Sequence, residues 1–202
     1  NSPQEKKVEY GGEQPHLTWD IERLEKEILN GLKKAKELDK IPVAVGIDTW
    51  GLDYVLLDEN DRLIGSVYSY RDWRTETTIP KVHEILPFEK LYEKTGIGFL
   101  AFNTIYQLYD DLHSGRMKNA KTFLNLPDYL HFCLTGVKKQ EYTMATTTGM
   151  VNSKTRAWDN EILEKLGYKK ELFGELTFPG ECVGEFTDYV AEIVGYKTKV
   201  IL

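Results

Sequence analysis

The chain has 202 residues, of which 41% are hydrophobic and 29% are charged, and its formal net charge is −6. This length is enough for a sizeable core, and the negative balance gives no reason to expect nucleic acid or an anionic membrane as a partner. No apolar run approaches the ~18 residues of a membrane span, and the polar N-terminus has no signal-peptide core.

The first third of the chain predicts a helix followed by a strand. Residues 1–15 are polar and predict at most one short strand, around Lys7–Tyr10. A helix is expected from Asp20 to Leu38, because apolar residues recur there at spacings of three and four and Asp20 is a suitable N-cap. Pro42 then precedes "VAVGI", whose continuous apolar run predicts a buried central strand.

The middle of the chain predicts a hairpin and then a helical block. "DYVLLD" and "LIGSVYSY" flank the polar turn "ENDR", as in a β-hairpin. Signals from Thr78 to about Leu134 are helical, since "FNTIYQLYDDL" and "AKTFLNLPDYLHFCL" have helical spacing. We expect a break at Pro127 and a helix end at Gly136.

The last third predicts a loop, a short helix and a strand. "EYTMATTTGMVN" is rich in threonine and predicts a loop with extended pieces, whereas "NEILEKLG" predicts a short helix with Gly167 as its C-cap. The final "TKVIL" reads as a strand. The order of elements indicates an α/β fold with a large helical insertion.

The cysteines and histidines indicate neither a disulfide framework nor a metal site. Cys133 and Cys182 form no CxxC pair, which favours two free thiols in a reducing cytosol and hence a cytoplasmic protein over a structural disulfide. The four histidines lack metal-ligand spacing, so no metal ligands are predicted. GxSxG, GxxxxGK[ST] and GxGxxG are all absent.

A polar segment, Asp48-Thr49-Trp50-Gly51, follows the predicted strand 43–47. Ligands of α/β sheets collect beyond the carboxyl ends of strands, so this position makes the segment a candidate site. The alternative is a tight turn, in which Asp48 and Asp53 bind local backbone and Gly51 supplies a positive φ. The residues alone leave both interpretations open.

Three further segments could bind a polar ligand. Arg71 and Asp72 supply the donors and acceptors that a sugar or polyol needs, although a surface ion pair worth ~0–1 kcal/mol would explain them too. Asn103 stands at a predicted helix start, where an N-cap role is the better interpretation. For Thr146–Thr148 a hydrogen-bonded turn is the better interpretation.

Six segments together resemble one family. "GIDTWGLDYVLLD", "YRDWRT", "LYEKTGIGFLAFNTIYQLY", "LPDYLHFCLTG", "EYTMATTTGMVN" and "WDNEILEKLG" resemble, in this order, the N-terminal half of the rhamnulokinase group of the FGGY carbohydrate kinase family. The match runs from "HLTWDIERL" to the last residue and therefore covers nearly the whole chain. Six segments in register, with their spacings, make the resemblance specific.

The resemblance implies a fold and a reaction. The family is similar to actin, with two ribonuclease H-like domains and a cleft between them; sugar binds mainly to the first domain, and ATP with Mg²⁺ binds to the second. The implied reaction transfers the γ-phosphoryl of ATP to the 1-hydroxyl of L-rhamnulose and gives L-rhamnulose 1-phosphate. Fuculose, xylulose or ribulose as the ketose, and a non-catalytic sugar-binding module, stay open as alternatives.

The resemblance also implies site residues. The glycine of the "TWG" motif contacts the sugar, the "YRD" segment lines the same cleft, and their neighbours flank the ligand. The substrate-binding residues implied here are Gly51, Trp50, Thr49, Arg71, Asp72 and Asn103.

The chain also departs from the family pattern. It lacks the family's first strand hairpin with its phosphate loop, the general-base aspartate is expected beyond Leu202, and the whole C-terminal ATP domain is missing. Residues 1–202 are therefore expected to form a partial actin-like (ribonuclease H-like) domain without catalytic, cofactor-binding or metal-binding residues. We expect it to bind neither ATP nor Mg²⁺ tightly, to be inactive alone, and to self-associate through an exposed sheet edge.

Overall fold

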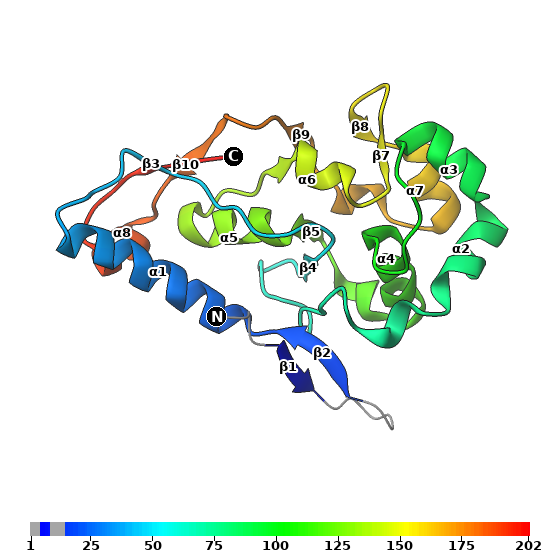
Figure 1. Ribbon diagram of the computed structural model, residues 1–202, viewed down its shortest axis with the longest axis horizontal. Coiled ribbons are helices and arrows are strands. Elements are labelled where there is room, and N and C mark those ends of the chain that lie inside the picture. Colours follow the sequence, from blue (N-terminus) through cyan, green and yellow to red (C-terminus); the bar gives the residue numbers. More distant parts are fainter. Residues whose placement is uncertain (1–4, 9–14) are drawn as a thin grey trace.

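A computed structural model describes residues 5–8 and 15–202 (Figure 1). The helices are α1 (Ile21–Glu37), α2 (Thr78–Ile85), α3 (Phe88–Thr95), α4 (Thr104–His113), α5 (Leu126–Thr135), α6 (Tyr142–Thr146), α7 (Asn160–Leu166) and α8 (Asp188–Val194). The strands are β1 (Glu5–Val8), β2 (His16–Trp19), β3 (Ala44–Val45), β4 (Tyr54–Leu57), β5 (Thr122–Asn125), β6 (Gln140–Glu141), β7 (Val151–Asn152), β8 (Ala157–Trp158), β9 (Leu176–Thr177), β10 (Cys182–Glu185) and β11 (Lys199–Ile201). The predicted mixed α/β class is confirmed.

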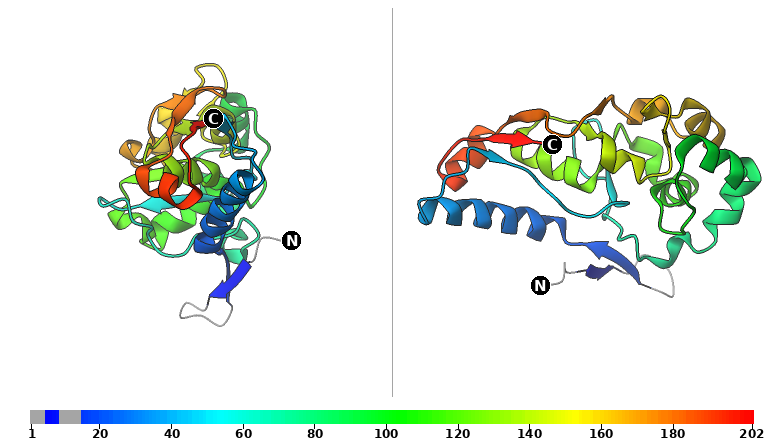
Figure 2. Two further views of the ribbon diagram at one scale, coloured as in Figure 1. Left: turned by 90° about the vertical axis from the view of Figure 1, so that its left-hand side faces the viewer. Right: turned by 45° about the horizontal axis from the view of Figure 1, so that its top comes forward.

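The strands form several small sheets. At one end of the molecule β11 pairs antiparallel with β10 and parallel with β3, and α1 and α8 pack together beside them (Figure 2). In the middle β4 pairs antiparallel with β5. Helix α5 contacts both of these sheets and so joins the two parts. Helices α2, α3, α4 and α7 gather at the other end (Figure 1).

Helical signals near the chain termini are confirmed. Helix α1 spans Ile21–Glu37, and the carboxylate of Asp20 caps it by accepting a hydrogen bond from the Arg23 backbone N–H at 3.3 Å. Helix α7 ends at Gly167, whose φ of +75° is the left-handed conformation that a glycine C-cap adopts. The final strand is confirmed as β11, and Cys133 and Cys182 are both free thiols, as predicted.

The N-terminal strands were only partly predicted. Strand β1 overlaps the predicted Lys7–Tyr10, of which residues 9–10 lie outside the described residues. It pairs antiparallel with β2, which the sequence pattern did not indicate. This hairpin projects from the body of the molecule (Figure 1).

The predicted hairpin is half right. Its turn forms, because Asp58 Oδ1 accepts hydrogen bonds from the backbone N–H groups of Asn60 and Arg62 at 2.8 and 3.0 Å. Its second arm, however, meets β4 only at an isolated bridge between Leu57 and Leu63 and then turns to β2. Strand β4 pairs instead with β5, whose last three residues are buried and extend the core.

Two predictions in the second half are wrong. Residues 120–125 do not continue a helix, and Pro127 does not break one: β5 ends at Asn125, and Pro127 lies in the first turn of α5, where its missing N–H costs nothing. The predicted loop "EYTMATTTGMVN" contains α6. The Glu141 carboxylate caps that helix by accepting from the N–H groups of Thr143 and Met144. The predicted end at Gly136 is confirmed.

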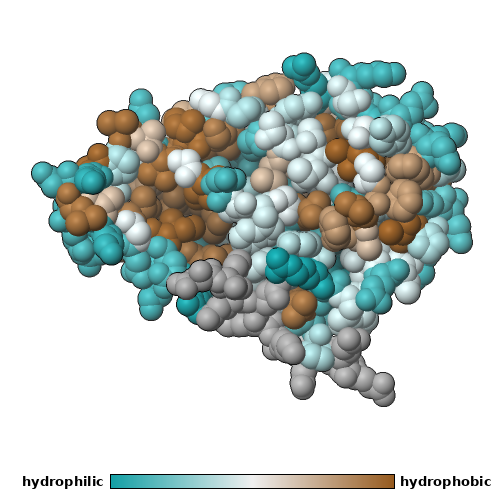
Figure 3. All heavy atoms as spheres, in the orientation of Figure 1, coloured by the Kyte–Doolittle hydropathy of each residue, from teal (hydrophilic) through white to brown (hydrophobic). Residues whose placement is uncertain are grey.

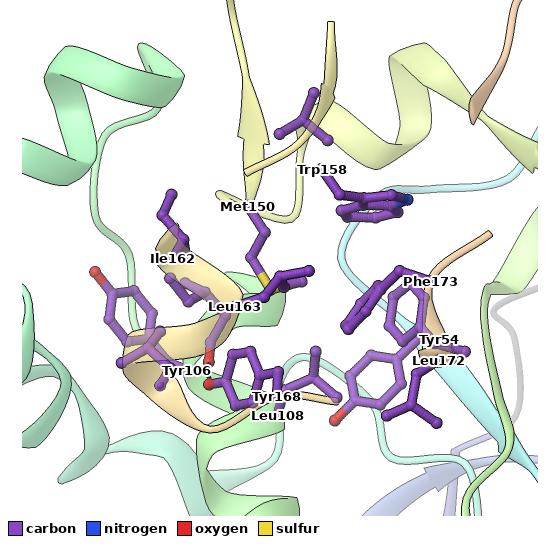
Figure 4. Close-up of a cluster of buried hydrophobic side chains, with 14 of the residues drawn as sticks. Tyr54, Tyr106, Leu108, Met150, Trp158, Ile162, Leu163, Tyr168, Leu172 and Phe173 are labelled. Atoms are coloured by element: carbon purple, nitrogen blue, oxygen red, sulfur yellow. Dashed lines mark hydrogen bonds between the residues drawn. The ribbon is translucent and has the colours of Figure 1, made fainter. Parts of the chain in front are cut away.

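The largest cluster of buried apolar side chains fills the helical end of the molecule. Figure 4 shows Trp158 and Phe173 packed beside Tyr54. Leu163, which lies in α7, and Tyr168, which follows it, belong to the same cluster. The hydroxyl of Tyr168 donates to the carbonyl of Ile105 at 2.7 Å, so this buried polar atom is satisfied. No helix within residues 5–8 and 15–202 has the length and hydrophobicity to cross a lipid bilayer.

The prediction of a buried central strand at 43–47 is wrong. Only Ala44 and Val45 form β3, which among the described residues pairs with β11 alone, and Val43 is 93% exposed. Apolar side chains gather on this side of the molecule around α1, β3 and α5 (Figure 3). A continuous apolar run predicts burial only where neighbouring strands cover it, and here one edge of the strand is open.

We expect this open edge to drive self-association of the 202-residue chain. Unpaired backbone groups at β3, next to exposed Ile41 and Val43, can pair with the same edge of another copy. Analytical ultracentrifugation should show mass rising with concentration. The variant Val43→Lys, which places a charge at the edge, should be monomeric, whereas Tyr92→Lys, at an exposed aromatic residue on α3, should behave like the parent chain. A monomeric parent chain at every concentration would contradict this expectation.

Candidate functional site

The segment that follows β3 comes close to helix α6. A Cβ atom built on Gly51 would lie 3.1 Å from Thr147 Oγ1 and 3.3 Å from Thr147 Cγ2. Gly51 does not have a positive φ, so the idea that this glycine is needed for a left-handed turn is wrong. A side chain at this position would instead crowd Thr147, which would have to shift by a few tenths of an ångström to admit it.

The left-handed residue of the segment is Leu52, with φ of +82°. This conformation is costly for a residue with a side chain, and such strain persists only where the surroundings impose it. The Leu52 carbonyl accepts hydrogen bonds from Thr104 Oγ1 at 2.7 Å and Gln107 Nε2 at 3.2 Å. The first turns of α4 therefore hold the segment in place.

Asp53 is fully buried and binds two indole rings. Its Oδ2 accepts hydrogen bonds from Trp19 Nε1 and Trp50 Nε1, both at 2.6 Å, and no hydrogen bond of ordinary geometry reaches Oδ1. Burial raises the pKa of Asp53 to about 7, against the two indole hydrogen bonds, which lower it. Asp53 is thus not the local backbone acceptor that a simple turn would contain.

The structure separates Arg71 from Asp72. Asp72 is buried, and its carboxylate accepts from the Leu17 and Arg74 backbone N–H groups at 2.7 and 3.0 Å and contacts His16 Nδ1 at 3.0 Å. It therefore ties β2 to the 3₁₀ turn Trp73–Thr75. Arg71 is exposed, with its guanidinium 4.9 Å from the centre of the neighbouring Tyr70 ring.

A buried ionic network supports the segment from α4. Arg74 Nη1 pairs with Asp111 Oδ1 at 2.8 Å, and Arg74 Nη2 donates to Gln107 Oε1 at 3.1 Å. The same Gln107 side chain holds the Leu52 carbonyl. Arg116 pairs with the other oxygen of Asp111 at 2.9 Å. The Arg74–Asp111 ion pair is thus connected through Gln107 to the carbonyl of Leu52, next to Gly51.

Asn103 occupies the N-cap position of α4, but its side chain does not cap the helix. Its Oδ1 accepts from the Leu100 N–H at 2.7 Å, and its Nδ2 lies 3.5 Å from the Thr147 carbonyl, at the limit of a hydrogen bond. Gly51 and Asn103, far apart in the sequence, therefore both contact Thr147.

The predicted threonine turn forms, and it also brings in a residue that was not predicted to lie at the site. The hydroxyls of Thr146, Thr147 and Thr148 each donate to the carbonyl three residues earlier, at 2.6, 2.8 and 2.6 Å. This local pattern agrees with the turn interpretation. The approach of Thr147 to Gly51 had no signal in the sequence, because nothing local relates α6 to the segment after β3.

Two pairs of aromatic rings involve residues that adjoin these contacts in the chain. The Trp50 ring lies 4.4 Å from the Trp19 ring, centre to centre, and Tyr70 meets Phe102 edge-on at 5.8 Å. We use the name Gly51 cluster for the residues that make these contacts or lie next to them in the sequence: Thr49, Trp50, Gly51, Tyr70, Arg71, Phe102, Asn103 and Thr147. Chemically the cluster offers a bare backbone, an indole, an exposed guanidinium and amide or hydroxyl groups, which suit a polyol with apolar ring or chain faces.

Metal-binding side chains do not cluster in the part of the chain that the structure describes. Within residues 5–8 and 15–202 no group of three or more His, Cys, Asp or Glu side chains is placed to hold a metal ion. The sequence also has no glycine-rich phosphate loop of the GxxxxGK[ST] kind.

Comparison with known proteins gives a consistent result. Residues 4–202 match the N-terminal domain of the FGGY family of carbohydrate kinases. The chain is 48% identical over 186 residues to a rhamnulokinase of Halalkalibacterium halodurans, covering 91% of this chain and 40% of that protein. It is 44% identical over 180 residues to a rhamnulokinase of Mannheimia succiniciproducens, covering 88% of this chain and 37% of that protein. The chain thus spans well under half the length of these relatives.

Solved structures agree on the fold. A xylulose kinase from Rhodospirillum rubrum superposes with a TM-score of 0.83 at 16% identity, covering 98% of this chain and 42% of that one. A ligand-bound xylulose kinase from Lactobacillus acidophilus gives 0.80 at 22% identity, with 98% and 41% covered. The predicted actin-like fold is confirmed by this likeness.

Proposed function

The chain belongs to the FGGY family of carbohydrate kinases, and on this premise we propose that residues 1–202 form the sugar-binding part of a rhamnulokinase-like enzyme. The intact enzyme would transfer the γ-phosphoryl of ATP to L-rhamnulose and give L-rhamnulose 1-phosphate. Identities of 48% and 44% to rhamnulokinases favour this sugar over fuculose, xylulose or ribulose. Assay of the intact gene product with a panel of these ketoses would separate them.

The close approach of Gly51 to Thr147 carries the proposal. It places a bare backbone beside the half-buried Trp50, with Asn103 held against the same threonine. A sugar ring or chain needs such close backbone contact on one side and an apolar surface on the other. We propose that Trp50, Gly51, Thr49 and Arg71 face the sugar.

In this proposal Asn103 and Asp72 do not touch the sugar but position the segments that do. The Asn103 side chain holds Leu100 and Thr147, and the Asp72 carboxylate holds β2 and the turn that follows Arg71. No step of phosphoryl transfer is assigned to the described residues. Free Cys133 and Cys182 support a cytoplasmic location.

Replacing Gly51 with alanine tests the site. The added Cβ would press on Thr147, and overpacking of this kind costs ~1–3 kcal/mol, so we expect L-rhamnulose to bind about tenfold more weakly by calorimetric titration. Gly31→Ala is the matched control: it lies in α1 with no atom within 4 Å and should leave sugar affinity unchanged. Lower melting temperature with unchanged sugar affinity for Gly51→Ala would show a purely structural glycine.

A non-catalytic sugar-binding module is the second candidate. The groups gathered around Gly51 suit sugar binding whether or not a nucleotide binds elsewhere in the protein. Binding of L-rhamnulose by an intact gene product that neither binds ATP nor phosphorylates the sugar would favour this candidate.

A further inference from the structure

The proposed sugar site leaves Asp53 unexplained. This carboxylate is 0% exposed and so cannot contact a ligand directly. A buried carboxylate is costly unless hydrogen bonds compensate for its lost hydration. Two indole N–H groups do so here, and both bind the same oxygen, Oδ2.

The two tryptophans differ in their surroundings. Trp19 belongs to β2, is 5% exposed and packs in the core with Val55 and Leu57. Trp50 follows the exposed strand β3, is only half-buried and belongs to the Gly51 cluster. Trp50 nevertheless packs against the same core cluster as Trp19, so Asp53 links a buried ring to a half-buried one. The two ring centres lie 4.4 Å apart, with 42° between the ring planes.

An aspartate suits this position better than an asparagine. An indole N–H can only donate, so each ring needs an acceptor. A carboxylate oxygen accepts two N–H bonds with charge assistance, whereas an amide would present a neutral carbonyl and bring its own NH₂ donors into a buried space. Burial raises the pKa of Asp53, whereas the hydrogen bonds from Trp50 and Trp19 and the charge of Arg74, in the 3₁₀ turn Trp73–Thr75, favour its ionised form.

We propose that Asp53 is a positioning residue that orients the Trp50 indole as the apolar platform of the sugar site. Asp53 acts through Trp50 and does not touch the sugar. This inference rests on the proposed function, because it names the part that one buried group plays in that same site. The inference also accounts for the strained backbone of Leu52, whose φ is +82°. Leu52 lies between Trp50 and Asp53 in the sequence, and the turn there lets the two side chains form their hydrogen bond.

The test compares Asp53→Asn with the parent chain in two measurements. Near-UV circular dichroism without sugar should lose the band that arises from the close Trp19–Trp50 pair. Calorimetric titration with L-rhamnulose should show about tenfold weaker binding, the effect of one lost hydrogen bond. Asp159→Asn is the control: this buried carboxylate caps α7 and contacts neither indole, so both measurements should match the parent chain.

A second variant keeps the test valid if Asp53→Asn fails to fold. Trp50→Phe keeps a ring but removes the indole N–H, and it should also weaken sugar binding about tenfold. Its control is Trp73→Phe, at a half-exposed tryptophan that does not contact Asp53, which should leave sugar binding unchanged. If the parent chain binds L-rhamnulose and both Asp53→Asn and Trp50→Phe bind it equally well, the inference is overturned. If the parent chain binds no ketose at all, the proposed function itself fails.

Discussion

Replacing Arg74 with methionine is expected to lower the free energy of unfolding by about 3–5 kcal/mol, because it breaks a buried ion pair from one side. The guanidinium is 4% exposed, and Asp111, its partner at 2.8 Å, is 1% exposed. Removal of Arg74 leaves a buried carboxylate with one cation fewer and deprives Gln107 Oε1 of the hydrogen bond that Arg74 donates. Urea unfolding followed by circular dichroism measures the loss.

The neighbouring arginine supplies a matched control for Arg74. Arg71 lies three residues earlier and is exposed, with its guanidinium over the ring of Tyr70. Arg71→Met should change the free energy of unfolding by about 0.5 kcal/mol or less. Equal urea midpoints for the two variants would show that the buried network contributes little to stability.

The Arg74 variant should also affect the proposed site. Gln107 holds the carbonyl of Leu52 through Nε2, and its Oε1 is held by Arg74. Loss of Arg74 frees that side chain and relaxes the strained residue next to Gly51. A fall in sugar affinity beyond the fall in stability, measured well below the melting temperature, would separate this local effect from partial unfolding.

The 202-residue chain alone is expected to transfer no phosphoryl group from ATP to L-rhamnulose. Phosphoryl transfer depends on positioning and charge neutralisation, and a general base adds roughly 10²–10⁴-fold. The resemblance places ATP with Mg²⁺ on the second domain and the general base after Leu202. A coupled assay of ADP release, with and without the chain, measures the rate.

The control for this assay is sugar binding by the same sample. A chain that binds L-rhamnulose in calorimetric titration yet releases ADP no faster than buffer is folded and lacks only the transfer machinery. Turnover above the no-protein rate, dependent on the ketose, would overturn the expectation and would require a base among residues 1–202.

Local sequence determined those parts of the molecule whose causes lie within a few residues. The cap of Asp20 on α1, the glycine end of α7 and the Asp58 turn depend on contacts at most four residues apart, so composition and spacing suffice to predict them. Six segments in register were enough to indicate the family. The sequence also predicted that the position of Gly51 is constrained, but not that the constraint is the close approach of Thr147.

Tertiary structure decided which candidate residues meet. Asp53 binds a tryptophan 34 residues away, Asp72 binds a histidine 56 residues away, and Asn103 reaches Thr147 over 44 residues. It also left β3 exposed despite its apolar run and made a strand of residues 122–125. Burial and hydrogen-bond partners depend on which segments the fold brings together, and no local pattern of charge or hydrophobicity records that choice.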